Sequence, residues 1–338
     1  MNLAYSGVVV IAEKALIVQV RRLASRAKNP AIQAGIGDDC AVLRLLPTRG
    51  RGGEKDTLVT TDFTLEGIHF RRDWHSAESV GHRCLARGLS DIAAMGGEPV
   101  AAFLSLALPR DLPQSWVSRF ARSLIKLAER YAVTLAGGDT AESPNGILAD
   151  IIVLGTAPKG NAVLRSGARP GDRIYVSGEL GGSAAAVWEM RTAPKRKLNP
   201  REYPRHFFPE PRVDLGRILR EKGLASAMID TSDGLSTDLA HICEASGVGA
   251  ELQEEAIPRA SVGKPAREVD LQFALHGGED YELLFTARRG KRIPSRIAGV
   301  PITQIGHIAR GIGTKIFLMN PCGVGYELEP RGWEHFRK

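Results

Sequence analysis

The chain has 338 residues, of which 43% are hydrophobic and 25% are charged, and its net charge is +7. This length predicts two domains, because a single small core could not bury so long a chain. The composition is that of a soluble globular protein, and no apolar run approaches membrane-spanning length. The basic balance leaves two interpretations open, a solvated surface or an anionic partner such as nucleic acid.

The cysteines are few and scattered, at positions 40, 84, 243 and 322, and they form no C-x-x-C pair. Zinc binding and dithiol redox chemistry therefore lack support. Isolated thiols of this kind are typical of a reducing compartment. Because the first residues also lack the charged start and cleavage site of a signal peptide, we expect a cytoplasmic protein.

The first half of the chain predicts alternating helices and strands. A helix is expected from Ser76 to Met95, because Ser76 can cap its start and two glycines follow its end. A second amphipathic helix is expected at 114–130, with Trp116, Phe120, Leu124 and Leu127 near one face. The remaining predicted elements are a helix at 11–27 and strands at 31–36, 57–61, 100–108, 132–136 and 147–155.

The turn-rich stretch 156–172 predicts a domain boundary, which divides the chain into residues 1–157 and 158–338. Five prolines in the basic loop 191–211 argue against a long helix there. The other predicted elements are strands at 173–178, 225–230, 281–287 and 301–308, and helices at 183–190, 213–222 and 235–246. Their irregular alternation predicts mixed α/β (α+β) layers rather than a barrel of identical units.

Six aspartates lie at the ends of apolar stretches, beside small or hydroxyl residues. They are Asp39 in GIGDD, Asp62 in VTTD, Asp91 in LSD, Asp139 in LAGGD, and Asp230 and Asp233 in IDTSDG. Each motif alone can be a turn or a helix cap, and Asp91 can be a solvent-facing helix residue. Together they predict one cluster that binds divalent cations. Because Mg²⁺ prefers hard oxygen ligands and often keeps phosphate oxygens among them, the cluster points to phosphate chemistry.

Two of these motifs also offer backbone N–H groups to an anion. In LAGGDTAES a strand is expected to end in two glycines, which would let the backbone approach a phosphate. In IDTSDG, Asp233 is expected at a helix start, where free N–H groups attract anions. Arg165 could hold a phosphate with its planar guanidinium, or be a linker charge. A P-loop, a protein-kinase motif set and a complete dinucleotide-binding pattern are absent from the sequence.

The ordered string of motifs resembles the thiamine-monophosphate kinase family, within the superfamily of aminoimidazole-ribonucleotide synthetase and selenophosphate synthetase. The motifs are GIGDDCAVL, TTDFTLEGIHF, LSDIAAMGGEP, LAGGDT, LRSGARPGD, IDTSDGLSTDL, GGEDYEL and GWEHF. The resemblance implies a two-domain synthetase-like fold, in which the N-terminal strands form a β-barrel with a second subunit and a C-terminal α/β domain covers the ATP cleft. It also implies a homodimer that uses ATP and Mg²⁺ to convert thiamine monophosphate to thiamine diphosphate.

The same resemblance assigns roles to individual residues. It implies that Asp39, Thr60, Thr61, Asp62, Asp91, Asp139, Asp230 and Asp233 are Mg²⁺ ligands, that Gly138, Asp139, Arg165 and Ser232 contact ATP, and that His69, Glu279 and Trp333 contact the substrate. It implies no acid–base residue, since a phosphate monoester is already mostly dianionic at neutral pH. Read alone, His69, Glu279 and Trp333 can instead be a structural histidine, a hairpin corner and a tail anchor.

One motif departs from the family, whose members usually read AVNLSD where this chain has ARGLSD, with Arg87 and Gly88. The sequence therefore does not determine the geometry around Asp91.

The sequence leaves two alternative functions to compare with the kinase interpretation. A selenophosphate synthetase-like enzyme would want a reactive cysteine near the N-terminus, whereas Cys40 lies inside a metal motif. A nucleic-acid-binding protein would be expected to carry an aromatic-rich basic stretch, which this chain lacks.

Overall fold

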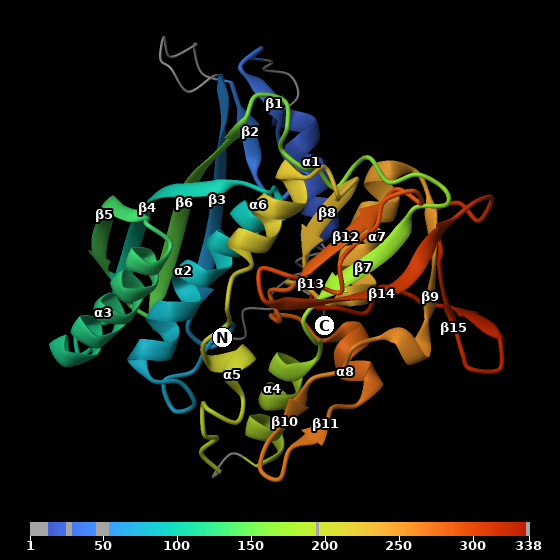
Figure 1. The fold of residues 1–338 in the computed structure, drawn as a ribbon. Coiled ribbons are helices and arrows are strands. Elements are labelled where there is room, and N and C mark those ends of the chain that lie inside the picture. Colours follow the sequence, from blue (N-terminus) through green and yellow to red (C-terminus); the bar gives the residue numbers. More distant parts are fainter. Residues whose placement is uncertain (1–12, 25–28, 45–53, 194–195, 336–338) are drawn as a thin grey trace, which may run out of the picture.

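The computed structural model describes residues 13–24, 29–44, 54–193 and 196–335 (Figure 1). Their elements form two large sheets and one two-stranded sheet, with helices packed between and around the large sheets, which confirms a two-domain fold of mixed α/β layers. Of the helix predicted at 11–27, the described part is α1 (Glu13–Ala24), and the rest lies outside the described residues. Within the described ranges, every helix is too short or too polar to cross a bilayer.

The first sheet has six strands in the order β1-β2-β3-β6-β4-β5, and only the β4–β5 pair is parallel. Its strands are β1 (Ile32–Ala34), β2 (Ala41–Leu43), β3 (Lys55–Leu65), β4 (Glu98–Leu108), β5 (Thr134–Glu142) and β6 (Leu148–Pro158). Helices α2 (Ala77–Ala94) and α3 (Gln114–Arg130) pack on one face of this sheet (Figure 1). We call the opposite face, which carries the half-exposed side chain of Phe63, the open face.

Helices α2 and α3 confirm the sequence prediction. The Ser76 hydroxyl oxygen accepts a hydrogen bond from the Ser79 N–H at 3.2 Å, which caps α2. Gly96, which follows the helix, has a φ of 65°. The predicted apolar stripe of α3 is buried against the sheet and α2.

The prediction that a strand ends at the glycines of LAGGD is wrong. Strand β5 continues to Glu142, because it pairs with β4 along its whole length, with Gly138 opposite Leu104 and Asp139 opposite Ser105. A Cβ at Gly138 would lie 1.8 Å from the Leu104 carbonyl oxygen. The glycine therefore permits close strand pairing at this position rather than a turn.

The second sheet runs β16-β15-β9-β14-β7-β12-β8, with β13 paired to β14, and only β9–β15 is parallel. Its strands are β7 (Arg173–Ser177), β8 (Ala227–Asp230), β9 (Gly249–Gln253), β12 (Leu283–Ala287), β13 (Arg296–Ile297), β14 (Val300–Ala309), β15 (Ile316–Met319) and β16 (Gly325–Glu327). The helices are α4 (Gly182–Thr192), α5 (Pro204–Phe207), α6 (Val213–Glu221), α7 (Leu235–Ser246), α8 (Leu271–His276) and a short 3₁₀ turn (Glu254–Ala256); β10 (Ser261–Val262) and β11 (Arg267–Glu268) form a small hairpin.

Helix α2 lies at the centre of the molecule. It packs on β3 and β6 of the first sheet and on α6 and β8 of the second half. Fourteen of its 18 residues are buried, as expected for a helix enclosed on several sides. One hydrophobic core accordingly runs from the first sheet through α2 to one face of the second sheet. The other face of the second sheet packs against α7 and α8.

Glycines allow the close approaches around α2. A Cβ at Gly216 of α6 would lie 2.0 Å from the Ala93 carbonyl oxygen, and one at Gly81 would lie 2.1 Å from that of Phe120. Gly88 faces β6, where a Cβ would lie 2.6 Å from Val153 Cγ2. The glycine of ARGLSD therefore has a packing role, because α2 crosses the strand closely at this point.

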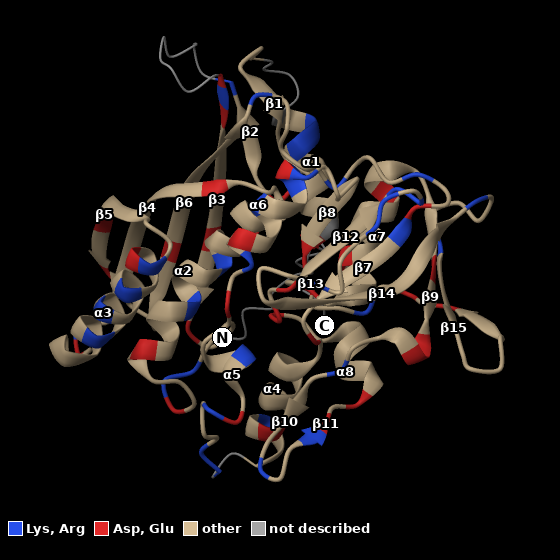
Figure 2. Cartoon of the chain, in the orientation of Figure 1, with Lys and Arg blue, Asp and Glu red and all other residues tan. Residues whose placement is uncertain are grey.

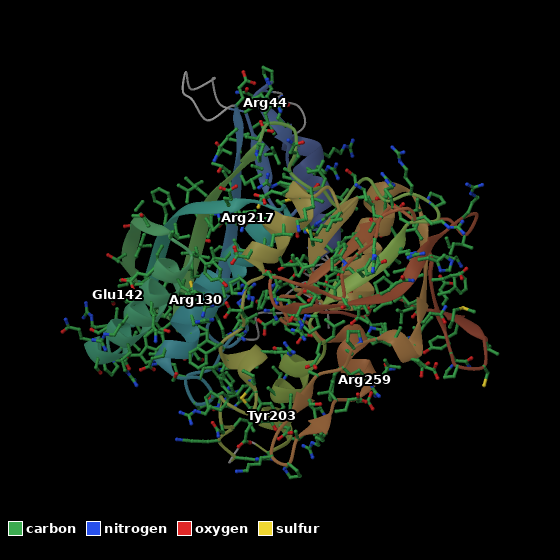
Figure 3. All side chains as sticks on the ribbon, viewed as in Figure 1. Arg44, Arg130, Glu142, Tyr203, Arg217 and Arg259 are labelled. Carbon is green, nitrogen blue, oxygen red and sulfur yellow. The ribbon has the colours of Figure 1, made fainter. Side chains whose placement is uncertain are left out.

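Polar contacts also join the two halves. The Arg220 Nε of α6 donates to the Gly96 carbonyl oxygen at 2.6 Å, and Nη2 donates to Glu98 Oε1 at 3.2 Å. Arg130 at the end of α3, labelled in Figure 3, pairs with Glu210 in the segment before α6. In Figure 2 basic and acidic residues are interspersed over both halves, which favours the solvated-surface interpretation of the net charge.

We expect Gly216→Ala to lower the free energy of unfolding by about 1–3 kcal/mol, because the new methyl group would push α6 away from the α2 backbone. Urea titration followed by far-UV circular dichroism measures this change. Gly290→Ala is the matched control, since a Cβ there meets nothing within 4 Å and the residue has no positive φ. Equal stability of the two variants would contradict the close-approach explanation.

Candidate functional site

Three of the six aspartates converge on one point. One carboxylate oxygen from each of Asp39, Asp91 and Asp230 lies within 4.8 Å of the other two. Asp39 precedes β2, Asp91 lies on α2 and Asp230 ends β8, so both halves of the chain contribute. We call these residues the three-carboxylate group.

Burial and mutual repulsion make this group a poor place for negative charge alone. Burial, followed by the charge of Asp39, raises the pKa of Asp230 from 3.8 to about 8. Burial and the neighbouring Asp62 raise the pKa of Asp91 well above its ordinary value. Carboxylate oxygens are hard donors that suit a divalent cation. The positive charge of such a cation would offset the repulsion between these buried carboxylates.

Strand β3 divides the predicted ligands of VTTD between its two faces, because strand side chains alternate. Thr60 and Asp62 face α2, and the Thr60 hydroxyl donates to Asp91 Oδ2. The Thr61 hydroxyl lies on the open face and donates to Asp150 Oδ1 at 2.7 Å. The structure therefore brings Thr60 and Asp62 beside the three-carboxylate group and turns the Thr61 side chain away from it.

Asp139 also lies on the open face. It is in cross-strand register with Ser105, then Asp150, then Phe63 of β3. Three strand spacings separate β5 from β3, roughly 14 Å. Within one chain, Asp139 and Gly138 thus lie apart from the three-carboxylate group, and their binding roles stay predictions.

Arg165 contacts the three-carboxylate group directly. Its Nη2 and Nε donate to the two carboxylate oxygens of Asp39 at 3.0 and 3.2 Å, and its backbone N–H donates to Asp38 Oδ1 at 3.0 Å. The Ser90 hydroxyl donates to Asp230 Oδ2 at 2.5 Å. These bonds orient the carboxylates of Asp39 and Asp230. They also place the guanidinium of Arg165, a predicted ATP contact, beside the three-carboxylate group.

The motifs IDTSDG and GGEDYEL lie side by side. The Glu279 N–H donates to the Ser232 carbonyl oxygen at 2.8 Å, and the Tyr281 N–H donates to that of Thr231 at 3.0 Å. Glu279 and Tyr281 have φ angles of 65° and 52°, a left-handed conformation that costs of order 1–3 kcal/mol for a residue other than glycine. The pairing therefore maintains a strained loop whose Glu279 is a predicted substrate contact.

Glu279 is held ionised by two arginines of α2. Its Oε1 lies 2.7 Å from Arg83 Nη2 and 3.4 Å from Arg87 Nη1. Burial alone would raise the pKa of Glu279, but Arg83 and then Arg87 outweigh it and lower the pKa to about 2. Glu279 is thus a partly buried carboxylate that keeps its negative charge at neutral pH.

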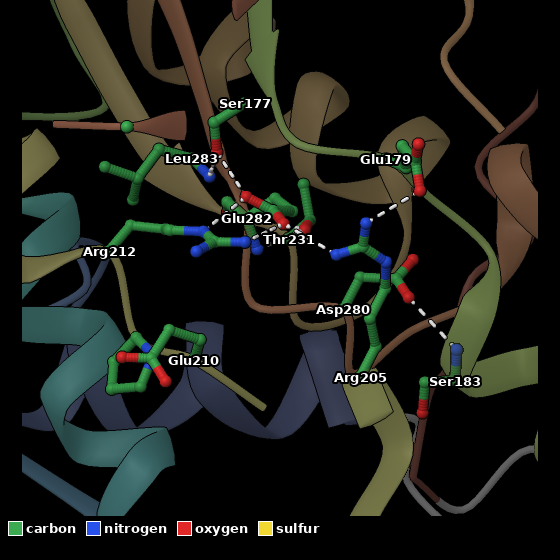
Figure 4. A network of polar contacts seen from close by, with 12 residues as sticks. Ser177, Glu179, Ser183, Arg205, Glu210, Arg212, Thr231, Asp280, Glu282 and Leu283 are labelled. Atoms are coloured by element: carbon green, nitrogen blue, oxygen red, sulfur yellow. Dashed lines mark hydrogen bonds and ion pairs between the residues drawn. The ribbon is translucent and has the colours of Figure 1, made fainter. Parts of the chain in front are cut away.

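Arg205 of the basic loop 191–211, and Arg212 directly after it, contact Glu282 at the end of the strained Glu279–Tyr281 loop. Arg212 Nε donates to Glu282 Oε2 at 2.7 Å, Arg205 Nη1 lies 3.3 Å from Oε1, and the Ser177 hydroxyl donates at 2.5 Å (Figure 4). Arg205 also pairs with Glu179 at 2.8 Å. Sequence reasoning gave this loop no role, because no local pattern links residues 70 or more positions apart.

A cavity of about 330 Å³ opens beside Glu279. Its lining includes His69, Trp74, His75, Met190, His206 and Glu279. His69 Nδ1 accepts from the Leu65 N–H at 3.0 Å, and burial, then the charge of Arg87, lowers the pKa of His69 to about 3. Its imidazole is therefore neutral at neutral pH.

Trp333 does not line this cavity, but the chain around it reaches the site. Its backbone N–H donates to the Asp233 carbonyl oxygen at 2.9 Å. Its ring lies edge-on to His335 at 5.7 Å, and His335 lies edge-on to His69 at 5.6 Å. Burial, then the charge of Glu13, raises the pKa of Asp233 to about 6. The C-terminal segment is thus anchored between a predicted metal ligand and a predicted substrate contact.

Sequence reasoning missed two histidines of the cavity. His75 Nε2 and His206 Nε2 lie 2.8 Å apart, and His206 Nδ1 lies 2.9 Å from the Ser183 hydroxyl. Burial lowers the pKa of both histidines, so both are neutral. They come from segments 131 positions apart, and no motif marks either one.

The two halves of the chain match two family models. Residues 37–157 match "AIR synthase related protein, N-terminal domain", and residues 169–310 match "AIR synthase related protein, C-terminal domain". Fold and site together therefore define a member of the AIR synthase-related class.

Individual relatives narrow the class further. A thiamine-monophosphate kinase of Salmonella typhimurium is 39% identical over 323 residues, which cover 92% of this chain and 94% of the relative. One of Bacillus subtilis is 35% identical over 317 residues, covering 91% and 95%. A solved structure described as "AaThiL complexed with AMPPCP and TMP" is 32% identical, with a TM-score of 0.80 and coverage of 96% of this chain and 97% of that one. The chain belongs to the thiamine-monophosphate kinase family.

In the absence of divalent cations, we expect the free energy of unfolding to fall as the pH rises from about 4 to about 8. The pKa of Asp230 is raised to about 8, so the folded state keeps a proton that the unfolded state releases near its ordinary value of 3.8. That stabilisation is largest below the ordinary pKa of 3.8 and is lost progressively until the pH exceeds the folded-state pKa. Urea titrations in EDTA at several pH values measure the slope.

Asp230→Asn is the matched variant for this measurement. We expect it to be more stable than the wild type at about pH 8 in EDTA, to show a shallower pH slope, and to gain less stability from added Mg²⁺. Parallel pH curves for the two proteins would contradict the repulsion between buried carboxylates.

Proposed function

We propose that this chain transfers the γ-phosphoryl group of ATP to the phosphate of thiamine monophosphate, which yields thiamine diphosphate and ADP. The observation that carries the proposal is the adjacency of two sites: a group of desolvated carboxylates and a cavity, joined through Glu279 and the arginines of α2. The complex of AaThiL with AMPPCP, an ATP analogue, and TMP supports the same pair of substrates.

The carboxylate side would bind the phosphate tail of ATP together with Mg²⁺. Asp39, Asp91 and Asp230 would hold the cations, with Asp62, Asp233 and Thr60 around them. Mg²⁺ supplies charge neutralisation between two polyanions that otherwise repel each other. Arg165, fixed on Asp39 at 3.0 Å, would orient the nucleotide phosphates, and the Ser232 segment would lie beside them.

The cavity side would bind the organic part of thiamine monophosphate. Neutral His69 and the ionised Glu279 line it. Because Arg83 and Arg87 offset the charge of Glu279, these residues would orient the thiazolium ring more than attract its positive charge. Trp333 stays a predicted contact through cation–π attraction, worth about 0.5–2 kcal/mol. The acceptor phosphate is already ionised at neutral pH, so these residues bind and orient it rather than remove a proton.

The proposal includes a homodimer in which two open faces together close a β-barrel. The open face carries Phe63, 54% exposed, with Phe103 and Ile152 half-buried beside it. It also carries Asp139 and the Thr61–Asp150 pair, so a partner subunit would give these residues a binding site that one chain lacks. We also propose a cytoplasmic location, supported by four free thiols and by the use of ATP.

ADP release measured with thiamine monophosphate, with and without Mg²⁺, tests the function. We expect ADP and thiamine diphosphate in equal amounts, only when both thiamine monophosphate and Mg²⁺ are present. ATP consumption that ignores thiamine monophosphate would favour another synthetase of the superfamily. Salt-dependent binding of nucleic acid without ATP turnover would favour the non-enzyme alternative.

Asp139→Asn is expected to abolish turnover while leaving the far-UV circular dichroism of the folded chain unchanged, because the side chain is exposed in the single chain and asparagine keeps the oxygen that accepts the Thr140 N–H at 2.8 Å. Glu142→Gln, on the same strand and equally exposed, is the control and is expected to remain active. Near-wild-type turnover of Asp139→Asn at saturating Mg²⁺ would refute the role assigned to Asp139.

A further inference from the structure

We propose that Arg87 is a phosphate-binding residue, which holds the acceptor phosphate of the substrate at the junction between the cavity and the carboxylates. The inference rests on the proposed function for the identity of that substrate. Its physical basis is the position of one guanidinium group, which contacts both sides of the site.

Arg87 lies between the two halves of the site. Its Nη1 is 3.4 Å from Glu279 Oε1, a cavity-lining residue, and its Nη2 is 3.5 Å from Asp62 Oδ1, beside the three-carboxylate group. Its charge also acts on both sides: after burial it is the next cause of the lowered pKa of His69, and it offsets part of the rise that burial and Glu13 cause in the pKa of Asp233. Arg87 is not itself part of the cavity lining, but a phosphate held between Glu279 and Asp62 would lie close to its guanidinium.

The donors of Arg87 are incompletely used. Its contacts with Glu279 and Asp62 are both longer than the usual 2.7–3.2 Å of an N–H···O bond. Among the described residues, the buried Arg87 Nε has no hydrogen-bond partner. By contrast, Arg83 makes a short pair with Glu279 at 2.7 Å and also donates to the His206 carbonyl oxygen. Arg87 therefore keeps donor capacity, whereas Arg83 is committed to the protein.

A phosphate monoester fits this unused capacity. A guanidinium presents five N–H donors in a planar fork, which matches two phosphate oxygens. Burial to 16% side-chain exposure removes competing water, and the surrounding carboxylates keep the group charged. A thiazolium near Glu279 would leave its phosphate facing Arg87, so the fork would orient the acceptor oxygen toward the carboxylate side.

Equilibrium binding tests the inference without turnover. Thiamine monophosphate is titrated into the wild-type chain and into Arg87→Met and Arg87→Lys by calorimetry, without ATP, and inorganic phosphate is titrated as a second probe. We expect Arg87→Met to weaken both ligands by roughly tenfold or more, since a hydrogen bond to a charged group is lost. Arg87→Lys keeps the positive charge but not the planar fork of donors. Its affinity for both ligands is expected to lie between those of the wild type and Arg87→Met.

Arg220→Met is the matched control, because Arg220 is also a buried arginine that joins the two halves, through Gly96 and Glu98, but it lies away from the cavity. We expect it to lower thermal stability without changing the affinity for either ligand. In steady state, Arg87→Met is expected to raise the KM for thiamine monophosphate about tenfold or more, and to change the KM for ATP far less.

Two outcomes separate this inference from the proposed function. Unchanged affinity of Arg87→Met for both ligands, with or without a loss of stability, would show that Arg87 is only a structural ion pair and would overturn the inference. If the wild type neither binds nor phosphorylates thiamine monophosphate, the proposed function fails. Loss of inorganic phosphate binding in Arg87→Met would then still support Arg87 as a phosphate ligand.

Discussion

The rest of the site depends on the crowding of buried carboxylates around one face of α2. Three oxygens from Asp39, Asp91 and Asp230 lie within 4.8 Å of one another, where burial and repulsion raise the pKa of two of the groups. Such a group is unstable unless the fold enforces it, since like charges out of water repel strongly. The enforcing contacts are hydrogen bonds from Ser90 and Arg165 and the packing of both sheets against α2.

The site has two electrostatic halves with opposite character. On the carboxylate side the pKa values of Asp91 and Asp230 are raised, because these groups lack a positive charge that would stabilise their ionised form. A bound cation would supply that charge. On the cavity side Glu279 has a lowered pKa, because Arg83 and Arg87 already neutralise it. The boundary between them falls at Arg87, which lies between Asp62 and Glu279, and this position is the basis for the phosphate-binding role that we propose for it.

Rigid packing sets the relative position of these halves. Gly216 and Gly81 let α6 and α3 approach the α2 backbone closely, and Gly88 does the same against β6. Arg205 and Arg212 pair with the buried Glu282, which follows the strained Glu279–Tyr281 loop directly in the chain (Figure 4). The end of that loop is therefore fixed by a polar network. The basic loop thus has a structural role in positioning a predicted substrate contact.

The sequence by itself determined the helices at 77–94 and 114–130, the mixed α/β architecture, the family and most of the site motifs, because caps, periodicity and ordered motifs are local signals. Only the tertiary structure decided which of those residues meet. The side chains of Thr60 and Thr61 lie on opposite faces of the first sheet, because strand side chains alternate. Strand β5 continues past the glycines because it pairs with β4, and this pairing puts Asp139 on the open face. The Ser90–Asp230 bond spans 140 positions, and such contacts follow from packing and register, which no local pattern records.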